Sequence, residues 1–308
     1  MEPSTSAAAT SPSGENFLTG HPRGLSTLFL TELWERFSYY GMRALLTLFM
    51  VAPIAEGGLA LGLEDAARIY GNYTMAVYML SIPGGFIADR LLGARNSVLV
   101  GGWIIALGHF ALAVPTVTTF YLGLVLVAIG TGLFKPNISG LVGALYEKND
   151  GRRDAGFSLF YMGINIGAFI APLITGFLAQ SAWFKAFLAN AGFDPATSWH
   201  WGFAAAGIGM TIAMLLYARG SRDLREPVSH EDRLLGSGNL WRDAVLAVLG
   251  TGALLLLALA SDLEGLEWLR WMFLVLPLSA IAFFALRGTE DGKRIAAIGV
   301  LFIAAMIF

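Results

Sequence analysis

The chain has 308 residues, of which 56% are hydrophobic and 14% are charged, and its mean hydropathy is +0.64. Soluble domains carry about 25% charged residues, so this composition excludes an ordinary soluble protein and indicates a polytopic membrane protein. The absence of cysteine excludes a disulfide framework, a thiol nucleophile and cysteine-ligated metal. The formal net charge of −2 indicates no particular partner.

Runs of about 20 mainly apolar residues, the length that crosses a bilayer as a helix, recur along the chain. We therefore expect an all-α membrane protein. About nine such segments occur, at residues 25–50, 66–88, 97–115, 119–146, 154–180, 201–218, 242–260, 268–286 and from about 295 onward. The last run is short of a span at Phe308, so we expect the chain to be the front part of a longer protein.

The segments divide the chain into five regions. These are a disordered cytoplasmic tail (1–24), an N-terminal six-helix transmembrane bundle (25–218), a charge-rich cytoplasmic linker (219–242), two additional transmembrane helices (243–287) and the start of a C-terminal bundle (294–308). The tail lacks the charged start and apolar core of a signal peptide. The two additional helices contain almost no polar side chains, and a purely structural role is the simplest interpretation.

Lys and Arg residues gather in alternate connections between the segments, beginning with the one at Arg23. The intervening connections contain only Arg68, Lys185 and Arg270. Cytoplasmic loops carry the excess of positive residues in membrane proteins. We therefore expect a multi-pass protein of the cell (inner) membrane with a cytoplasmic N-terminus.

The connection between the second and third segments contains glycines and charges at regular positions. Gly85, Asp89, Arg90, Gly93 and Arg95 resemble the G-x-x-x-D-R-x-x-G-x-R loop of the major facilitator superfamily. Glycines let helix ends approach closely, and the charges can lock the loop in one conformational state and release it in another. A basic loop that only fixes topology is the alternative.

Two carboxylates and two guanidiniums lie inside the otherwise apolar first segment, at Glu32, Glu35, Arg36 and Arg43. Each buried charge costs at least about 2.5 kcal/mol. At helical spacing the four share one face over about 16 Å, so this face meets a protein interior or a water-filled cavity. A purely structural ion-pair network is the alternative, but it has little need of two carboxylates around one arginine and a second arginine two turns away.

Lys135 supplies another cation, inside the fourth segment. Pro136 breaks a helix hydrogen bond there, and Asn137 adds polarity. Snorkelling of Lys135 is the alternative. With both glutamates ionised, the two acids and three cations sum to +1, and each bound proton adds one positive charge. We expect the site to attract an anion more strongly when it holds a proton.

Further hydrogen-bonding groups lie in the second and fifth segments, at Tyr70, Tyr73, Tyr78, Tyr161 and Asn165. A single intramembrane tyrosine is more often a packing or interface residue than a ligand. Asn165, between two glycines, is equally suited to joining close-packed helices.

Four motifs together resemble those of the proton-dependent oligopeptide transporters, a branch of the major facilitator superfamily. They are E-x-x-E-R-F-x-Y-Y-G-M-R at 32–43, G-G-x-x-A-D-R-x-x-G-x-R at 84–95, G-T-G-x-x-K-P-N at 130–137 and F-S-L-F-Y-M-G-I-N-I-G-A at 157–168. The resemblance implies the superfamily's fold, with an N-terminal six-helix bundle, two inserted linker helices and the start of the seventh core helix. It also implies inward transport of di- and tripeptides with protons by alternating access.

The resemblance also implies roles for individual residues. Glu32, Glu35, Arg36 and Lys135 form the proton-coupling group, and Arg43 with Lys135 receives the peptide carboxylate. The remaining pocket residues are Tyr39, Tyr40, Tyr73, Tyr161 and Asn165. Protons are the coupling ion, and we expect no metal or other cofactor and no nucleic-acid partner. We expect a monomer whose partners are a peptide, protons and the lipid bilayer.

Two other functions stay open. The chain is also compatible with a family member for another anionic or zwitterionic solute, such as nitrate, and with a non-transporting peptide sensor, although the intact proton motif argues against a sensor. We do not expect an enzyme, because the sequence shows no nucleophile–base pair, no histidine cluster in the spans and no phosphate loop.

Overall fold

The computed structural model describes Leu18, residues 20–147 and residues 149–227. All of these belong to the first of two units, residues 1–247. Most of the expected tail, the linker from residue 228 onward, the two additional helices and the start of a further bundle lie outside the described residues.

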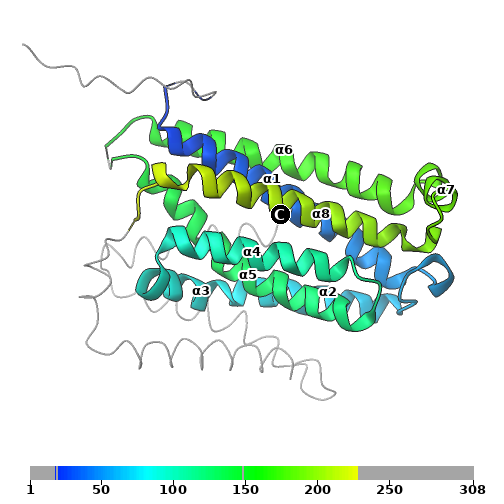
Figure 1. Ribbon diagram of the computed structural model, residues 1–308. Helices are drawn as coiled ribbons and strands as arrows, with labels where there is room; N and C mark the ends of the chain where they lie inside the picture. Colours follow the sequence, from blue (N-terminus) through cyan, green and yellow to red (C-terminus); the bar gives the residue numbers. More distant parts are fainter. Residues whose placement is uncertain (1–17, 19, 148, 228–308) are drawn as a thin grey trace, which may run out of the picture. The chain divides into compact units, whose positions relative to one another are not determined.

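The described residues form helices and turns and contain no strand, which confirms the expected all-α fold class (Figure 1). The helices are α1 (Arg23–Val51), α2 (Leu63–Met79), α3 (Ser81–Ile87), α4 (Ala94–Leu112), α5 (Val117–Ala144), α6 (Arg153–Gln180), α7 (Ala182–Asn190) and α8 (Ser198–Gly220). Three short 3-10 turns, η1 (Ile54–Glu56), η3 (Pro195–Thr197) and η4 (Ser221–Asp223), and one π-helical turn, η2 (Ala88–Leu92), complete them.

Two helical features differ from the sequence expectation. The second apolar segment is broken at Leu80 into α2 and α3 and then continues as the π-helical turn η2. The short helix α7 was not expected; it begins where the Ser181 hydroxyl accepts a hydrogen bond from the Phe184 N–H (3.1 Å) and ends before Gly192, whose φ is +82°. Both features depend on local backbone geometry that hydropathy does not report.

Among the described residues, four helical runs are long and apolar enough to cross a membrane: Leu63–Leu92, Val117–Ala144, Arg153–Gln180 and Pro195–Asp223. The helix α1 is not among them, because its buried charges interrupt the apolar sequence. The cost of those charges must be met by neighbouring protein.

The long helices form two closely packed groups. The helix α1 packs along α6 and α8, and α4 packs along α5 (Figure 1). The helix α8 also contacts α4 and so joins the two groups. The helices α2 and α3 lie against α5. The polar face of α1 is thereby left to meet α2 and α5.

Small residues bring α1 and α6 into close contact. Gly163, Gly167, Ala171 and Thr175 recur every four residues on the buried side of α6. A Cβ atom on Gly167 would lie 2.2 Å from the carbonyl oxygen of Leu33. Small residues at this spacing let helix backbones meet in a membrane, where packing rather than the hydrophobic effect drives association.

Reciprocal glycines do the same for α4 and α5. A Cβ atom on Gly101 would lie 2.7 Å from the Gly130 carbonyl oxygen, and one on Gly130 would lie 2.6 Å from the Gly101 carbonyl oxygen. Two turns farther along, Gly108 and Gly123 repeat the arrangement. The two helices therefore touch backbone to backbone at two levels.

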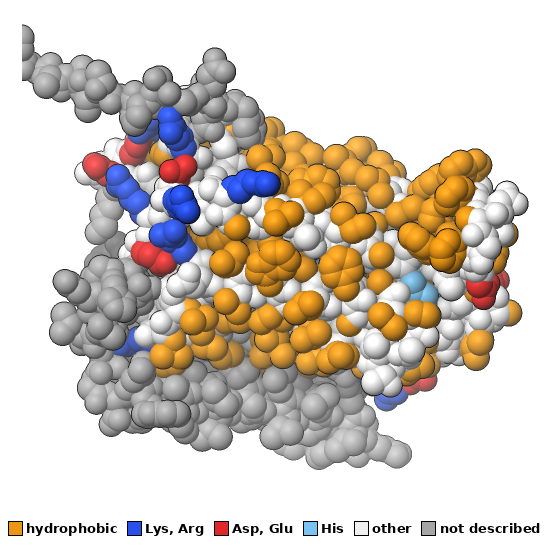
Figure 2. Space-filling model, in the orientation of Figure 1, with side chains coloured by type: hydrophobic (Ala, Val, Ile, Leu, Met, Phe, Trp, Pro, Cys, Tyr) orange, Lys and Arg blue, Asp and Glu red, His pale blue; other side chains and the backbone are white. Residues whose placement is uncertain are grey.

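Positive charge gathers at one end of the bundle, where α1, α4 and α6 begin and α5 and α8 end; we call this the basic end. Figure 2 shows apolar side chains over the middle of one face and Lys and Arg side chains at one end of it. The described residues at the basic end include Arg23, Arg90, Arg95, Arg152, Arg153, Arg219, Arg222 and Arg225. Arg68 and Lys185 lie toward the opposite end.

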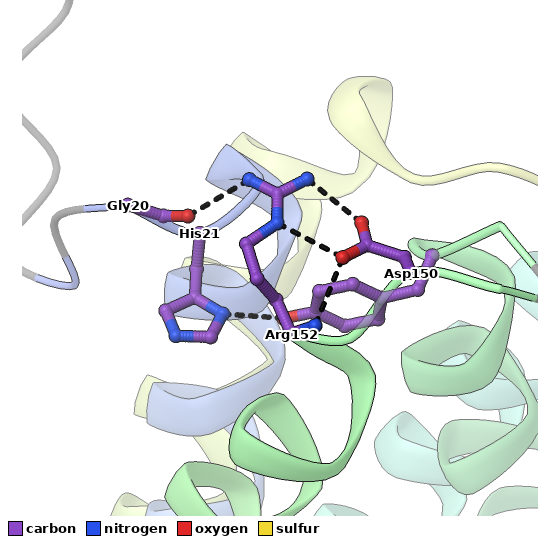
Figure 3. Close-up of polar contacts among 5 residues, drawn as sticks. Gly20, His21, Asp150 and Arg152 are labelled. Carbon is purple, nitrogen blue, oxygen red and sulfur yellow. Dashed lines mark hydrogen bonds and ion pairs between the residues drawn. The ribbon is translucent and has the colours of Figure 1, made fainter.

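At the basic end, the segment before α1 is fastened to the α5–α6 connection (Figure 3). Arg152 donates a hydrogen bond to the Gly20 carbonyl oxygen (2.9 Å), and the His21 ring nitrogen Nδ1 lies 2.9 Å from the Tyr146 hydroxyl. Arg152 also holds Asp150, with 2.7 Å between Nη2 and Oδ2. Hydrogen bonds from the Arg152 side chain and backbone lower the pKa of Asp150 to about 2, so this pair stays ionised at neutral pH.

The close contact between α1 and α6 predicts a position-specific effect of adding one methyl group. Gly167→Ala forces the α1 and α6 backbones apart, and overpacking of this kind costs about 1–3 kcal/mol. We expect a lower thermal unfolding temperature in detergent. Gly176→Ala, also in α6, is the matched control because its Cβ position has open space. Equal unfolding temperatures of the two variants would contradict the role assigned to Gly167.

Candidate functional site

One guanidinium serves two carboxylates on α1. Arg36 Nε donates a hydrogen bond to Glu32 Oε1 (2.6 Å) and lies 2.9 Å from Glu35 Oε2. All three side chains are buried: the exposed fractions are 1%, 1% and 7% for Glu32, Glu35 and Arg36. The spacing places them on one face of a helix, and the two expected ion pairs are present. We call these three residues the Glu-Glu-Arg triad.

The triad carries an unbalanced charge in a buried setting. With both carboxylates ionised its net charge is −1, and Glu32 Oε2 and Glu35 Oε2 accept no hydrogen bond from the described residues. A buried carboxylate without full compensation is expensive, and a proton removes the excess charge. Chemically, the triad is therefore suited to taking up one proton.

Lys135 approaches this region from α5. Its Nζ lies 4.5 Å from the ring centroid of Tyr78, which is a cation–π contact. It is half-buried and near enough to Glu35 for their charges to interact, but it forms no ion pair within 4 Å in the described part of the chain. Lys135 thus has an aromatic partner on α2 rather than a carboxylate partner on α1.

Arg43 has the same kind of partner. Its Nε donates a hydrogen bond to the Tyr70 hydroxyl, and its guanidinium carbon lies 5.5 Å from the centroid of the Tyr70 ring. Tyr73, between these two tyrosines on α2, is buried, and its hydroxyl has no partner among the residues described. The helix α2 therefore presents tyrosines to both free cations of the site.

Sequence reasoning placed only Tyr73 of the three α2 tyrosines in the pocket. Tyr70 and Tyr78 are expected from the sequence as intramembrane hydrogen-bonding groups, but no sequence pattern pairs them with a cation. Their spacing of eight residues puts them near one helix face, two turns apart. That spacing is the signal by which the pair could be found.

The other expected pocket residues differ in their placement. Tyr39 and Tyr40 on α1 are half-buried and pack edge to face, with 5.2 Å between ring centroids, and the Arg36 guanidinium carbon lies 5.7 Å from the Tyr39 centroid. On α6, Tyr161 is 56% exposed and Asn165 is also exposed. The described residues do not bring these two α6 side chains to the triad, and the α1–α6 contact is made by glycines rather than by Asn165.

The segment from Gly84 to Arg95 approaches α5 most closely at Gly84, one residue before Gly85, the first glycine of its motif. A Cβ atom on Gly84 would lie 2.0 Å from the Gly132 carbonyl oxygen on α5, whereas the Cβ position of Gly85 is open. Asp89 is exposed and lines a cavity of about 110 Å³ with Pro136 and Asn137. The loop therefore rests on the same stretch of α5 that carries Lys135.

A buried polar contact that the sequence did not reveal joins α1 to α4. The Ser38 hydroxyl lies 2.7 Å from His109 Nε2, and both side chains are inaccessible to solvent. A single histidine in an apolar segment carries no pattern that names its partner. In the described ranges, no group of three or more His, Cys, Asp or Glu side chains is placed to hold a metal ion.

The triad predicts that its buried arginine matters more to stability than an arginine in an exposed ion pair. Arg36→Gln leaves two buried carboxylates without a cation, and breaking a buried ion pair costs about 3–5 kcal/mol. We expect thermal unfolding in detergent at a much lower temperature than for wild type. The control is Arg68→Gln, which removes the exposed pair with Asp65, a kind worth about 0–1 kcal/mol. Comparable losses in the two variants would contradict a buried, charge-paired triad.

Comparisons with known proteins show which family the chain resembles. Residues 95–308 match the family model described as the POT family. The chain is 46% identical over 213 residues to the peptide transporter YePEPT of Yersinia enterocolitica, covering 68% of this chain and 39% of that protein. It is 46% identical over 206 residues to a di-/tripeptide transporter of Lactococcus lactis, covering 66% of this chain and 38% of that protein.

Solved structures give the same result over most of the chain. A crystal structure of a peptide transporter POT mutant in complex with alafosfalin matches with a TM-score of 0.69 and 35% identity, covering 93% of this chain and 57% of that one. A POT family transporter in complex with 5-aminolevulinic acid matches with a TM-score of 0.67 and 34% identity, covering 93% and 58%. The chain thus spans less than two thirds of these relatives, and the resemblance found in its motifs is confirmed: the chain belongs to the POT family.

Proposed function

We propose that the protein is a proton-coupled symporter that imports di- and tripeptides across the cell (inner) membrane by alternating access. The observation that carries the proposal is the buried Glu-Glu-Arg triad, with two further cations held near it by tyrosines. The names of the relatives, a peptide transporter and a di-/tripeptide transporter, support a peptide substrate over nitrate and over a sensor role.

The coupling step follows from charge. With both glutamates ionised, the triad holds an excess negative charge near Lys135, and Arg43 lies two turns farther along α1. A proton on Glu35 or Glu32 removes that charge, and the site as a whole gains positive charge. A charge pair 4 Å apart is worth about 4 kcal/mol at an effective dielectric of 20, which is enough to shift a two-state conformational equilibrium.

The substrate's carboxylate is the natural ligand of the cations this step makes available. Arg43 is exposed and Lys135 is only half-buried, so a ligand can reach both side chains. Guanidinium and ammonium groups form charge-assisted hydrogen bonds with carboxylates. Hydroxyl groups suited to the peptide backbone come from Tyr39, Tyr40 and Tyr73 on α1 and α2, and we propose that Tyr161 and Asn165, exposed on α6, also contact the peptide.

The orientation of the protein in the membrane follows from the distribution of charge. We assign the basic end to the cytoplasm by the positive-inside rule, which gives a cytoplasmic N-terminus. A proton that moves inward then releases about 2.3 kcal/mol of free energy per 100 mV of membrane potential. The loop bearing Asp89, Arg90 and Arg95 lies at the basic end, where its charges are placed to hold one conformational state. We propose that the transporter works as a monomer.

The coupling role of Glu35 is tested by separating proton-driven uptake from exchange. In the full-length gene product in liposomes, Glu35→Gln should lower proton-driven dipeptide uptake by at least about tenfold, a change of about 1.4 kcal/mol. Peptide counterflow, which needs no net proton movement, should continue. Glu64→Gln, at an exposed position in α2, is the control. Undiminished proton-driven uptake by Glu35→Gln would refute the assignment.

The role of Lys135 is tested by affinity and pH together. Lys135→Ala removes a cation from the substrate carboxylate and from the neighbourhood of Glu35. We expect weaker dipeptide binding by about tenfold or more, the order of a lost charge-assisted hydrogen bond, and half-maximal uptake at a higher pH.

Lys185→Ala, in α7 toward the opposite end, should change neither property. Lys135→Arg should restore part of the affinity because it keeps the charge. If Lys135→Ala left both affinity and pH dependence unchanged, Lys135 would have no part in the site.

A further inference from the structure

The helix α4 begins at a residue that cannot cap it. Gly93 occupies the N-cap position with φ +83°, a left-handed conformation that favours glycine. Helix N-caps are usually Ser, Thr, Asp or Asn, whose side chains accept hydrogen bonds from the first free N–H groups. Gly93 has no side chain, so the first N–H groups of α4 need a partner from elsewhere.

A distant carboxylate supplies that partner. Glu226, in the segment after α8, accepts hydrogen bonds from Ala94 N–H at Oε2 (3.0 Å) and from Arg95 N–H at Oε1 (3.2 Å). Its negative charge also meets the positive end of the helix dipole. The Tyr217 hydroxyl, on α8, donates to the Arg95 carbonyl oxygen (3.0 Å). The start of α4 is thus tied twice to α8 and the segment beyond it.

The same segment is fixed on both sides of Glu226. Leu224 is 4% exposed, and its Cδ2 lies 2.9 Å from the position of a Cβ on Gly24, at the start of α1. Pro227 lines the cavity of about 110 Å³ together with Asp89, Pro136 and Glu226 itself. We call Leu224, Glu226 and Pro227 the clasp. It contacts the start of α1, the start of α4 and the side of α5.

We propose that Glu226 is a positioning residue for the transport reaction, acting through the α4 N-terminus on the loop 88–93 that carries Asp89 and Arg90. The role rests on the proposed function. Glycine has the greatest backbone freedom of all residues, so an uncapped Gly93 is a hinge between the loop and α4. While both carboxylate oxygens of Glu226 accept these hydrogen bonds, the backbone at Gly93 cannot rotate freely. The loop 88–93 then keeps a fixed orientation relative to α4 and α8.

The geometry orders the possible replacements. Glu226→Ala removes both hydrogen bonds and the charge. Glu226→Gln keeps the size and one accepting oxygen but loses the second acceptor and the negative charge, so its effect should be smaller. Asp223→Asn is the matched control, because Asp223 is an exposed acid close in sequence that forms no hydrogen bond or ion pair with α4 in the described part of the chain.

Amide hydrogen exchange of the full-length gene product in detergent tests the contact directly. In Glu226→Ala the amides of Ala94 and Arg95 should exchange about tenfold faster, the order expected for a lost N-cap. Glu226→Gln should fall between this variant and wild type, and Asp223→Asn should match wild type. In liposomes, the maximal rate of dipeptide uptake should fall several-fold in Glu226→Ala with KM unchanged, because the clasp lies away from the cations that bind substrate.

Each other outcome has a definite meaning. Unchanged exchange at Ala94 and Arg95 in Glu226→Ala overturns the clasp itself. Faster exchange with an unchanged maximal rate overturns the positioning role and leaves Glu226 as a structural cap. A wild-type protein that imports no peptide overturns the proposed function and the positioning role with it, while the exchange measurement still decides the clasp. The unfolding temperature of Glu226→Gln shows whether a change in rate follows from global destabilisation.

Discussion

The burial of two carboxylates around one guanidinium, on a single turn of α1, is the constraint that the rest of the bundle satisfies. Such a group cannot face lipid, so α1 must be surrounded by protein. The small residues of α6 allow this by letting the α1 backbone approach at Leu33, and α8 covers another side. The polar face that remains points to α2 and α5, where the other charged and aromatic groups of the site lie.

The partners of the two outer cations matter as much as the triad. Arg43 and Lys135 each lie against a tyrosine ring of α2. A carboxylate partner would neutralise them, whereas an aromatic face stabilises a cation and leaves its charge in place. The site therefore keeps its acids paired with Arg36 and its remaining positive charge available, which is the state an anionic ligand group requires.

The fold class and the triad could be predicted because they depend on local spacing. Glu32, Glu35 and Arg36 share a helix face wherever that helix packs. The contacts of Ser38 with His109 and of Glu226 with Ala94 join residues 71 and 132 positions apart, and no sequence pattern pairs them. The choice of Gly84 over Gly85 for the close approach depends on helical phase, which the break at Leu80 resets.

The stretch of α5 around Pro136 connects the site to the basic end. Because Pro136 has no N–H, the carbonyl oxygen of Gly132 loses its helix partner. The helix α3, which leads into the loop 88–93, approaches this oxygen at Gly84, where only a glycine fits. Asn137 Nδ2 donates to the Leu133 carbonyl oxygen (2.6 Å) and adds a bond beside the gap in the ladder. Lys135, the residue before the proline, contacts the Tyr78 ring. Pro136 lines the cavity that Glu226 and Pro227 of the clasp also line. Lys135 and the contact made at Gly84 therefore lie on the same stretch of α5, where Pro136 removes one helix hydrogen bond.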